Sequence, residues 1–167
     1  MFGVMQNKAA RLIGLGALCI SMLYSLSVQA VHLSTNGLGQ VLIFPYYNTR
    51  GLNDTLISVV NHSDDIKALK VRILEGENGR SVAHFNLYMP PDDVWTASVT
   101  ESLSGPVLRT ADPSCTAPYF YAGSGELDLT LMGITTNPDS GRASLDRLRE
   151  GYIEVIEMGT LLSLIHI

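Results

Sequence analysis

Apolar and polar residues alternate with a period of two over much of the first hundred residues of this chain. Between positions 66 and 75, Leu69, Val71 and Ile73 fall on one face, while Lys70 and Arg72 fall on the other. This period is typical of a β-strand with one face on a core and the other in water. The pattern predicts five strands: Gly39–Tyr47, Thr55–Asn61, Ile66–Glu75, Ala83–Met89 and Val94–Thr100.

The connections between these five segments carry residues that favour tight turns. Asn, Asp, Gly and Pro set the backbone geometry of such turns, and they gather at Asn61–Asp65, Glu77–Gly79 and Pro90–Asp93. Short strands with turn signals between them favour an antiparallel sandwich over βαβ units. Pro45 has no amide hydrogen, so we expect the first strand at a sheet edge. Trp95 shares a face with apolar neighbours, and we expect it in the core.

The pattern weakens after Thr100. Ser102–Gly125 contains Gly, Pro and Ser with little period, which indicates a long loop. A loop of this length is uncommon inside a compact domain unless it is functional or held in place. Glu126–Met132 alternates again and predicts a short strand.

The region from 140 to 158 combines a helical segment with a strand. Ser140–Glu150 predicts one or two helical turns, with Ser140 as the N-cap and Leu145 and Leu148 as the apolar pair. Its arginines are interleaved with acidic residues, which indicates a solvated face; they are Arg142, Arg147 and Arg149. Gly151–Met158 alternates like a strand, and we expect this last strand to be left unpaired, with an open edge that promotes aggregation.

The first 30 residues have the organisation of a secretory signal peptide. Lys8 and Arg11 precede an uncharged apolar run, and Ala30 is a small residue at the end of a cleavage site. The alternative is a transmembrane anchor, but the run is at the short limit for crossing a bilayer and is broken by glycines and serines. We therefore expect export to the periplasm, the outer surface or the extracellular space.

The last six residues, Leu162–Ile167, form a hexapeptide that a transposon-derived sequencing adapter also encodes. An ordinary apolar C-terminal strand is the alternative. The adapter interpretation predicts a chain in three parts: residues 1–30 as signal peptide, residues 31–161 as a C-terminally truncated β-sandwich domain, and residues 162–167 as translated adapter.

Charge narrows the range of partners. Loss of the signal peptide removes Lys8 and Arg11, so nine basic and 16 acidic residues remain, a formal net charge of −7. Nucleic acids and anionic membrane surfaces select basic patches. We expect no nucleic-acid partner, and membrane contact only through the signal peptide before its cleavage.

Cys115 is the single cysteine that follows the signal peptide, because Cys19 leaves with it. An unpaired thiol is unusual in an oxidising compartment. A buried free cysteine is one alternative, but the segment Asp112–Pro118 has the composition of a loop. We expect Cys115 to pair with a cysteine in a part of the protein beyond residue 161. A catalytic thiol is a weaker alternative, since no recognisable histidine motif surrounds it.

Several segments together resemble a group of uncharacterised exported or surface proteins of proteobacteria. The segments that carry the similarity are Asn53–Asn61, Lys67–Gly76, Phe85–Tyr88, Asp93–Thr96 and Gly151–Gly159. The resemblance covers most of residues 36 to 159, and its members are longer, which implies a truncated member here. The early strands also resemble the Ig-like modules of bacterial surface proteins. The fold implied is an all-β, antiparallel Ig-like β-sandwich with one short helix and a long loop, incomplete at the C-terminus.

Residues with catalytic or metal-binding chemistry are few and scattered. His32, His62 and His84 lack metal-ligand spacing. Acidic pairs in the turns, Asp64–Asp65 and Asp92–Asp93, could bind Ca²⁺, but the calcium-loop pattern is absent and Asp is an ordinary turn residue. We expect no catalytic residues, no metal ligands and no cofactor.

Exposed aromatic residues are the remaining candidates for contact with a partner. Tyrosines suit protein or glycan surfaces, although they also occur at the rim of a sandwich. The candidates are Tyr46, Tyr47, Tyr119 and Tyr121.

The function expected from the sequence is that of an exported, non-catalytic β-sandwich module with a structural, adhesive or assembly role. Its partners would be other envelope proteins, glycans or copies of itself. Two alternatives stay open: an accessory domain of an exported enzyme whose catalytic part lies beyond residue 161, and a calcium-binding extracellular module.

Overall fold

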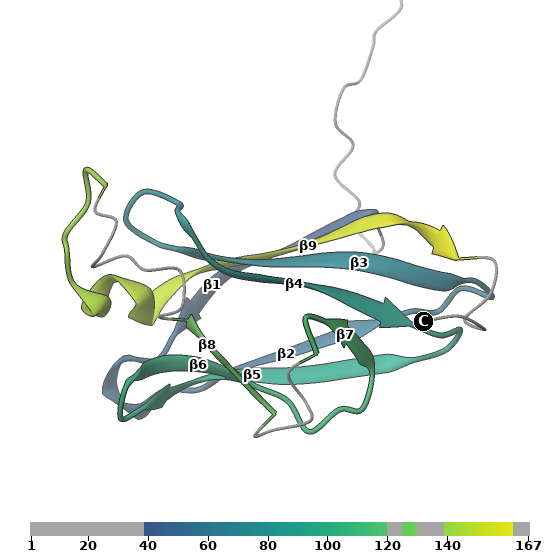
Figure 1. Cartoon of the computed structure of the whole chain (residues 1–167), viewed down its shortest axis with the longest axis horizontal. Coiled ribbons are helices and arrows are strands. Elements are labelled where there is room, and N and C mark those ends of the chain that lie inside the picture. Colours follow the sequence, from purple (N-terminus) through teal and green to yellow (C-terminus); the bar gives the residue numbers. More distant parts are fainter. Residues whose placement is uncertain (1–38, 120–124, 130–138, 162–167) are drawn as a thin grey trace, which may run out of the picture. The chain divides into compact units, whose positions relative to one another are not determined.

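Two antiparallel β-sheets contain nearly all the regular structure of the described residues (Figure 1). The computed structural model describes residues 39–119, 125–129 and 139–161. One sheet has the strand order β1-β9-β3-β4-β7 and the other β2-β5-β6-β8. The strands are β1 (Val41–Asn48), β2 (Thr55–Val60), β3 (Ile66–Glu75), β4 (Ser81–Met89), β5 (Val94–Ser102), β6 (Gly105–Arg109), β7 (Cys115–Ala117), β8 (Glu126–Asp128) and β9 (Glu150–Leu161).

The prediction of five alternating strands before residue 101 is confirmed, with bounds that differ by at most two residues. Their apolar faces meet between the two sheets, where Phe85 and Trp95 pack with ring centroids 5.7 Å apart. Trp95 is buried, as expected. The alternation of β3 is also confirmed, since Val71 and Ile73 are buried while Lys70 is only half-buried. Burial of these faces removes apolar surface from water and is the main favourable contribution to folding.

The last strand of the described chain is fully paired, so the expectation of an unpaired β9 was wrong. β9 lies between β1 and β3 and is antiparallel to both. Gly151 permits this close packing, because a Cβ atom there would collide with the carbonyl oxygen of Leu74 and lie 2.8 Å from the ring of Tyr47. β1 is the edge strand next to β9, which confirms the position expected from Pro45.

The long loop expected over Ser102–Gly125 was also wrong, because this region contains β6 and β7. β5 and β6 form a hairpin in which Ser102 pairs with Gly105. The first four residues of β6 are all buried, so the strand shows no alternation. Strands buried on both faces lack a period of two, and the glycine and proline at the start of β6 also suggest a loop.

The helical segment is shorter than predicted and begins later. A 3₁₀ helix, η3, covers Leu145–Arg149, and Ser144 rather than Ser140 caps it, since the Ser144 hydroxyl accepts a hydrogen bond from the amide of Asp146. Leu148 is buried but Leu145 is exposed. A second 3₁₀ turn, η1 (Arg50–Leu52), connects β1 to β2.

The predicted solvated arginine face was wrong for Arg147, which is the most buried charged side chain of this segment. Its guanidinium donates from Nε to Glu75 Oε2 at 3.1 Å and from Nη1 to Asp139 Oδ1 at 2.7 Å. A third bond runs from Nη2 to Asn78 Oδ1 at 2.7 Å. Buried charges need such partners because an unpaired one is costly. Arg147 therefore joins the residues before β9 to the turn between β3 and β4.

Glu75, the other member of this buried pair, has a pKa well below its usual value. Burial acts to raise the pKa, but hydrogen bonds from Arg147 and from the backbone amides of Arg80, Glu77 and Asn78 outweigh it and lower the pKa to about 2. The pKa of Asp139 is lowered as well, first by its hydrogen bond from Arg147. Both carboxylates are thus bound in their ionised form.

Several earlier expectations about segments of the chain lie outside the described residues. They are the signal peptide of residues 1–30, the adapter-derived residues 162–167, and the part of the predicted strand Glu126–Met132 that follows residue 129. Within the described ranges, the structure has no helix of the length and apolarity needed to cross a membrane.

The Glu75–Arg147 pair makes stability dependent on pH. The carboxyl of Glu75 has a lower pKa in the folded than in the unfolded chain, so it stabilises the fold above its unfolded pKa, near 4.5, and this contribution is lost as the pH falls towards about 2. We expect the Glu75→Gln variant to lose about 3–5 kcal/mol of unfolding free energy at pH 7, because it leaves the Arg147 charge buried with a poorer partner.

Urea unfolding of the wild type and the variant, followed by Trp95 fluorescence from pH 7 to pH 2, measures this effect. The variant should show a weaker dependence on pH between 5 and 2. Glu154→Gln is the matched control, since Glu154 pairs with Arg72 on the partly exposed face of β9 and exposed pairs contribute about 0–1 kcal/mol. Equal losses in the two variants would contradict a special role for the buried pair.

Candidate functional site

The aromatic residues expected to contact a partner do not form one site. Tyr46 is exposed on β1, and its hydroxyl donates to Glu150 Oε2 at 3.3 Å. Tyr119 is also exposed, but it follows β7 at the opposite edge of the five-stranded sheet. Tyr121 lies outside the described residues.

Tyr47 does not belong to the exposed group, and its selection as a contact residue was wrong. The side chain is fully buried, and its hydroxyl donates to the carbonyl oxygen of Leu148 at 2.9 Å. Burial, with smaller contributions from the charges of Glu75 and Glu150, raises the pKa of Tyr47. Its role is to join β1 to the residues just before β9.

Cys115 is the first residue of the short edge strand β7. The composition of its flanking residues had indicated a loop, and that expectation was wrong. The thiol is exposed and forms no disulfide with any described residue. A pairing with a cysteine elsewhere in the protein stays a prediction.

The histidines and turn carboxylates do not converge. His84 is exposed on β4 and His62 is exposed just after β2, while His32 precedes the described residues. The carboxylate of Asp93 accepts a hydrogen bond from the Ser114 hydroxyl at 3.1 Å and thereby supports a turn. Across residues 39–119, 125–129 and 139–161, no group of three His, Cys, Asp or Glu side chains could hold a metal ion.

The outer strands of the two sheets differ in how well they are protected from other strands. β7 and β8 have three residues each, and β1 carries Pro45 and a register shift between Phe44 and Tyr47. Short length, proline and bulges all discourage pairing with a further strand. β2 has none of these features. It has six residues without a charge, and its register with β5 is continuous.

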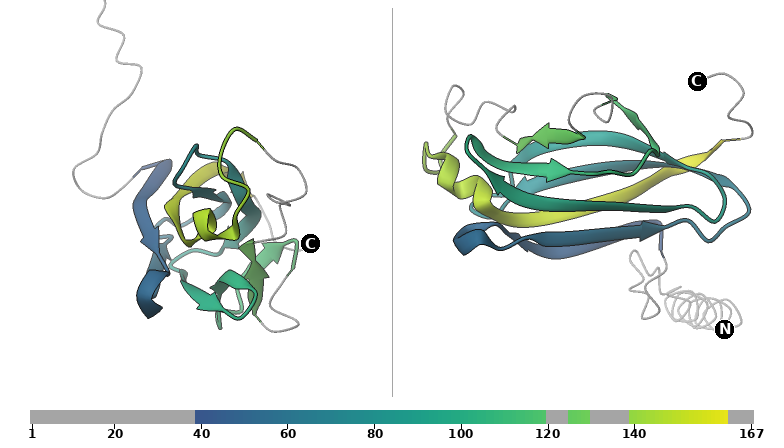
Figure 2. Two further views of the ribbon diagram at one scale, coloured as in Figure 1. Left: turned by 90° about the vertical axis from the view of Figure 1, so that its left-hand side faces the viewer. Right: turned by 90° about the horizontal axis from the view of Figure 1, so that it is seen from below.

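A groove opens between the end of β2 and the start of β1, at the edges of the two sheets. Figure 2 shows both strands, in blue, along the same side of the molecule. At one end, Thr55 holds the strands together, since its hydroxyl oxygen accepts from the Asn48 amide at 3.0 Å. At the other end the strands diverge around a pocket of about 210 Å³.

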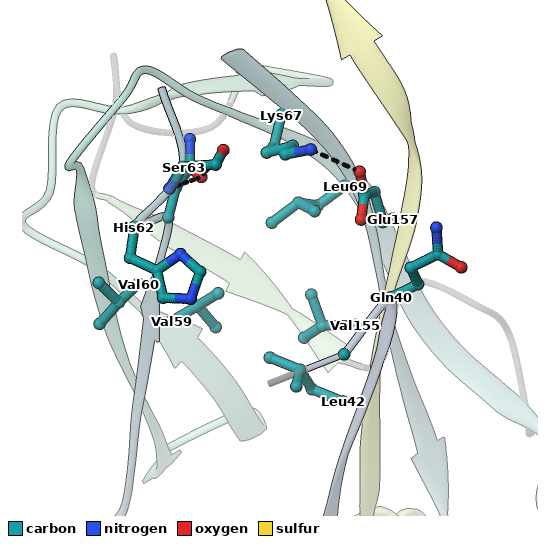
Figure 3. Close-up of a pocket in the computed structure, with 12 residues that line it drawn as sticks. Gln40, Leu42, Val59, Val60, His62, Ser63, Lys67, Leu69, Val155 and Glu157 are labelled. Atoms are coloured by element: carbon teal, nitrogen blue, oxygen red, sulfur yellow. Dashed lines mark hydrogen bonds and ion pairs between the residues drawn. The ribbon is translucent and has the colours of Figure 1, made fainter. Parts of the chain in front are cut away.

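The floor of this groove is apolar (Figure 3). Val59 of β2, Leu69 of β3 and Val155 of β9 are core residues that also line the pocket. Leu42 of β1 is partly buried against the same core. The pocket is smaller than the ~300–1,000 Å³ typical of small-molecule sites. Its size and lining suit one or two apolar side chains.

Polar residues surround the mouth of the groove. Lys67 Nζ donates to Glu157 Oε1 at 2.9 Å on the β9 side, which leaves these two charges paired. On the β2 side, the Ser63 hydroxyl donates to Asn61 Oδ1 at 2.8 Å. The hydroxyl therefore takes part in the turn rather than in a pair with the neighbouring His62.

Asn61 shapes this mouth. Its side-chain amide donates to the carbonyl oxygens of Asp65, Met89 and Pro90 at 2.8, 3.1 and 2.8 Å. The side chain is buried. It thus fastens the turn between β2 and β3 to the turn between β4 and β5, and it sets where β2 ends beside the pocket.

Sequence reasoning missed the groove because its walls combine three consecutive strands, β1 to β3, with β9, which lies about 75 residues further along the chain. One signal was present: Thr55–Val60 combines strong β-propensity with a complete lack of charge, which is unusual for an edge strand. The pattern of a single segment does not reveal whether its edge is covered. No protein-family model, curated protein or solved structure matches this chain.

The role of Asn61 can be tested by substitution. Asn61→Ala leaves buried carbonyl oxygens of the β4–β5 turn without a donor, and each unsatisfied buried group costs about 1–3 kcal/mol. We expect a loss of about 2 kcal/mol in unfolding free energy, measured by urea denaturation. Asp64→Ala, in the same turn and exposed, is the matched control and should change stability by less than about 0.5 kcal/mol. A stable Asn61→Ala variant would show that water replaces the amide.

Proposed function

We propose that this protein is an exported, non-catalytic β-sandwich module with an assembly role, which binds an extended polypeptide segment at the edge of β2. The observation that carries the proposal is the uncharged, unprotected edge of β2 beside an apolar groove. An added strand satisfies the outward backbone groups of such an edge, and its alternate side chains enter adjacent pockets.

The strand order supports a fold of the immunoglobulin-like kind. β2 and β5 pair in one sheet, while β3 and β4, which lie between them in sequence, pair in the other. Strands B and E, and C and C′, have these relationships in immunoglobulin-like sandwiches. In that fold the final strand, G, lies beside strand F, which pairs with strand C. Here β9 pairs with β3 in the place of strand F, and β1 lies beside β9 in the place of strand G. Modules of this architecture serve many functions, so the fold alone assigns no binding role; the edge of β2 and the groove beside it support one.

The size of the pocket also favours a peptide strand over a small ligand. About 210 Å³ accommodates apolar side chains entering from one strand. The charges nearest to it, Lys67 and Glu157, are already paired with each other. Recognition at this site would therefore depend on backbone hydrogen bonds and apolar contacts, and it would depend little on salt concentration.

Export is the first part of the proposal that an experiment can address. Expressed in a Gram-negative host, the chain should appear in the envelope or periplasmic fraction with Val31 as its first residue. Ala30→Arg should block cleavage, because the processing site requires a small residue there, whereas Gln29→Ala should be processed normally. Uncleaved protein in the cytosol would contradict export.

Strand binding is the second part. A labelled eight-residue peptide with alternating apolar and polar side chains should bind saturably, as measured by fluorescence anisotropy. The same peptide with proline at alternate positions should not bind, since proline cannot donate to a ladder. Val60→Pro should weaken binding at least tenfold, and Val60→Thr, which keeps the amide, should weaken it much less. Equal affinity for both peptides would exclude β-strand addition.

A further inference from the structure

The backbone of β2 presents alternate residues to solvent at its free edge. The amide of Asn61 donates to the carbonyl oxygen of Asp93 on β5 at 2.9 Å. In an antiparallel ladder, residues separated by an even number of positions along one strand point their backbone N–H and C=O groups to the same side. Ile57 and Val59 therefore point their backbone groups towards β5, as Asn61 does. Leu56, Ser58 and Val60 point theirs away from the sheet, and within the described ranges no strand pairs with them.

The residues whose backbone groups point outwards also place their side chains in one row, and this row is self-complementary when two copies meet antiparallel. Along the outer face of β2 the row reads Asp54, Leu56, Ser58, Val60, His62, all of them exposed. Leu56 and Val60 are among the large apolar residues that the fold leaves in water, at 80% and 58% exposure. Reversed about Ser58, the row places apolar opposite apolar and carboxylate opposite imidazole.

We propose that the segment bound at β2 is β2 of a second copy of this chain, antiparallel and related by a two-fold axis at Ser58. The inference rests on the proposed function, since it names the partner of the same edge. Ile57 and Val59 of each copy stay in their own core, so the self-pairing uses the backbone edge and the outer face of β2 and leaves the pocket unfilled. A two-fold interface brings the same surface of both copies together, so only a self-complementary strand can form it. The two four-stranded sheets then form one continuous sheet across the interface.

The register follows from the hydrogen-bond orientation and the side chains together. With Ser58 opposite Ser58, the amides and carbonyls of Leu56, Ser58 and Val60 all meet outward-pointing groups of the second copy. Each Leu56 then lies opposite a Val60, and such cross-strand apolar pairs stabilise a sheet. A two-fold axis at Leu56 would instead place Asp54 opposite Ser58, and it would place Val60 opposite Leu52, which lies in the η1 turn and not in an extended strand.

The alternative axis at Val60 is also less favourable. It would place Leu56 opposite Asp64, an exposed acidic residue of the following turn. The Ser58 register places Asp54 opposite His62 at both ends of the interface, where the imidazole can donate a hydrogen bond to the carboxylate. Because β2 itself has no charge, no like charges oppose each other along the paired segment.

Disulfide trapping tests the register directly. In a full-length chain with Cys19 and Cys115 replaced by alanine, Ser58→Cys should oxidise to a covalent dimer, because directly opposed Cα atoms lie about 5.5 Å apart, within the disulfide range. Leu56→Cys is the matched control. Its two copies would lie four residues apart along the strands, about 14 Å, and should not be linked. Equal dimer yields from both variants, or none from Ser58→Cys, would overturn the register.

Sedimentation velocity over a concentration series tests the interface without a cross-link. The wild type should form a dimer, and Ser58→Pro, which removes only an outward-pointing amide, should raise the dimer dissociation constant at least tenfold. Ser58→Ala should leave it unchanged. Circular dichroism checks that the proline variant folds. If it does not fold, Val60→Lys is the second variant, because it places a charge opposite Leu56 of the other copy.

The outcomes separate this inference from the proposed function. A wild-type chain that stays monomeric, yet binds the alternating peptide and loses that binding in Val60→Pro, would overturn self-pairing and leave strand binding intact. A dimer that Ser58→Pro and Val60→Lys do not weaken would place the contact between copies elsewhere and also overturn self-pairing. Failure of both peptide binding and dimerisation would overturn both proposals.

Discussion

The pairing of β9 with both β1 and β3 is the constraint on which the rest of this structure depends. It joins segments about 75 to 115 residues apart, and several non-local contacts surround it. The Tyr47 hydroxyl bonds to the Leu148 carbonyl, the Thr49 amide to the Arg149 carbonyl, and the Gly76 amide to the Glu150 carbonyl. Gly151 allows the backbones to approach. Such long-range contacts carry a high loop-closure entropy, so the sheet is complete only when the last strand is in place.

The location of β1 explains the groove. β9 holds β1 in the five-stranded sheet, while β2, which follows only a short 3₁₀ turn later, belongs to the other sheet. The two edges therefore face each other without pairing, and they diverge away from the Thr55–Asn48 contact. Among the described strands, three of the outer ones are short, bulged or interrupted by proline, and β2 is the outer strand that can accept another. The same topology that completes the core thus creates the surface on which the proposed function depends.

A buried cluster of charged residues stabilises the end of the molecule away from the groove. Arg147 fastens the residues before β9 to the turn after β3 through Glu75 and Asp139. A buried cluster of this kind is costly to desolvate and costly to break, and it favours one arrangement of the surrounding chain. The groove, in contrast, has paired charges only at its rim. The rigid cluster around Arg147 and the uncovered edge of β2 beside the groove fit a module that holds its shape while it binds a further strand.

The sequence by itself determined the early strands, the burial of Trp95 and the edge position of β1, because period-two alternation and proline chemistry act locally. It also marked Thr55–Val60 as an uncharged strand. It did not reveal β6, which is buried without alternation, or the burial of Tyr47 and Arg147, whose partners lie about 70 to 100 residues away. It did not reveal the groove either. Whether a strand edge is covered, and whether an arginine meets a carboxylate or water, depends on which segments the topology brings together, and only the tertiary structure decides that.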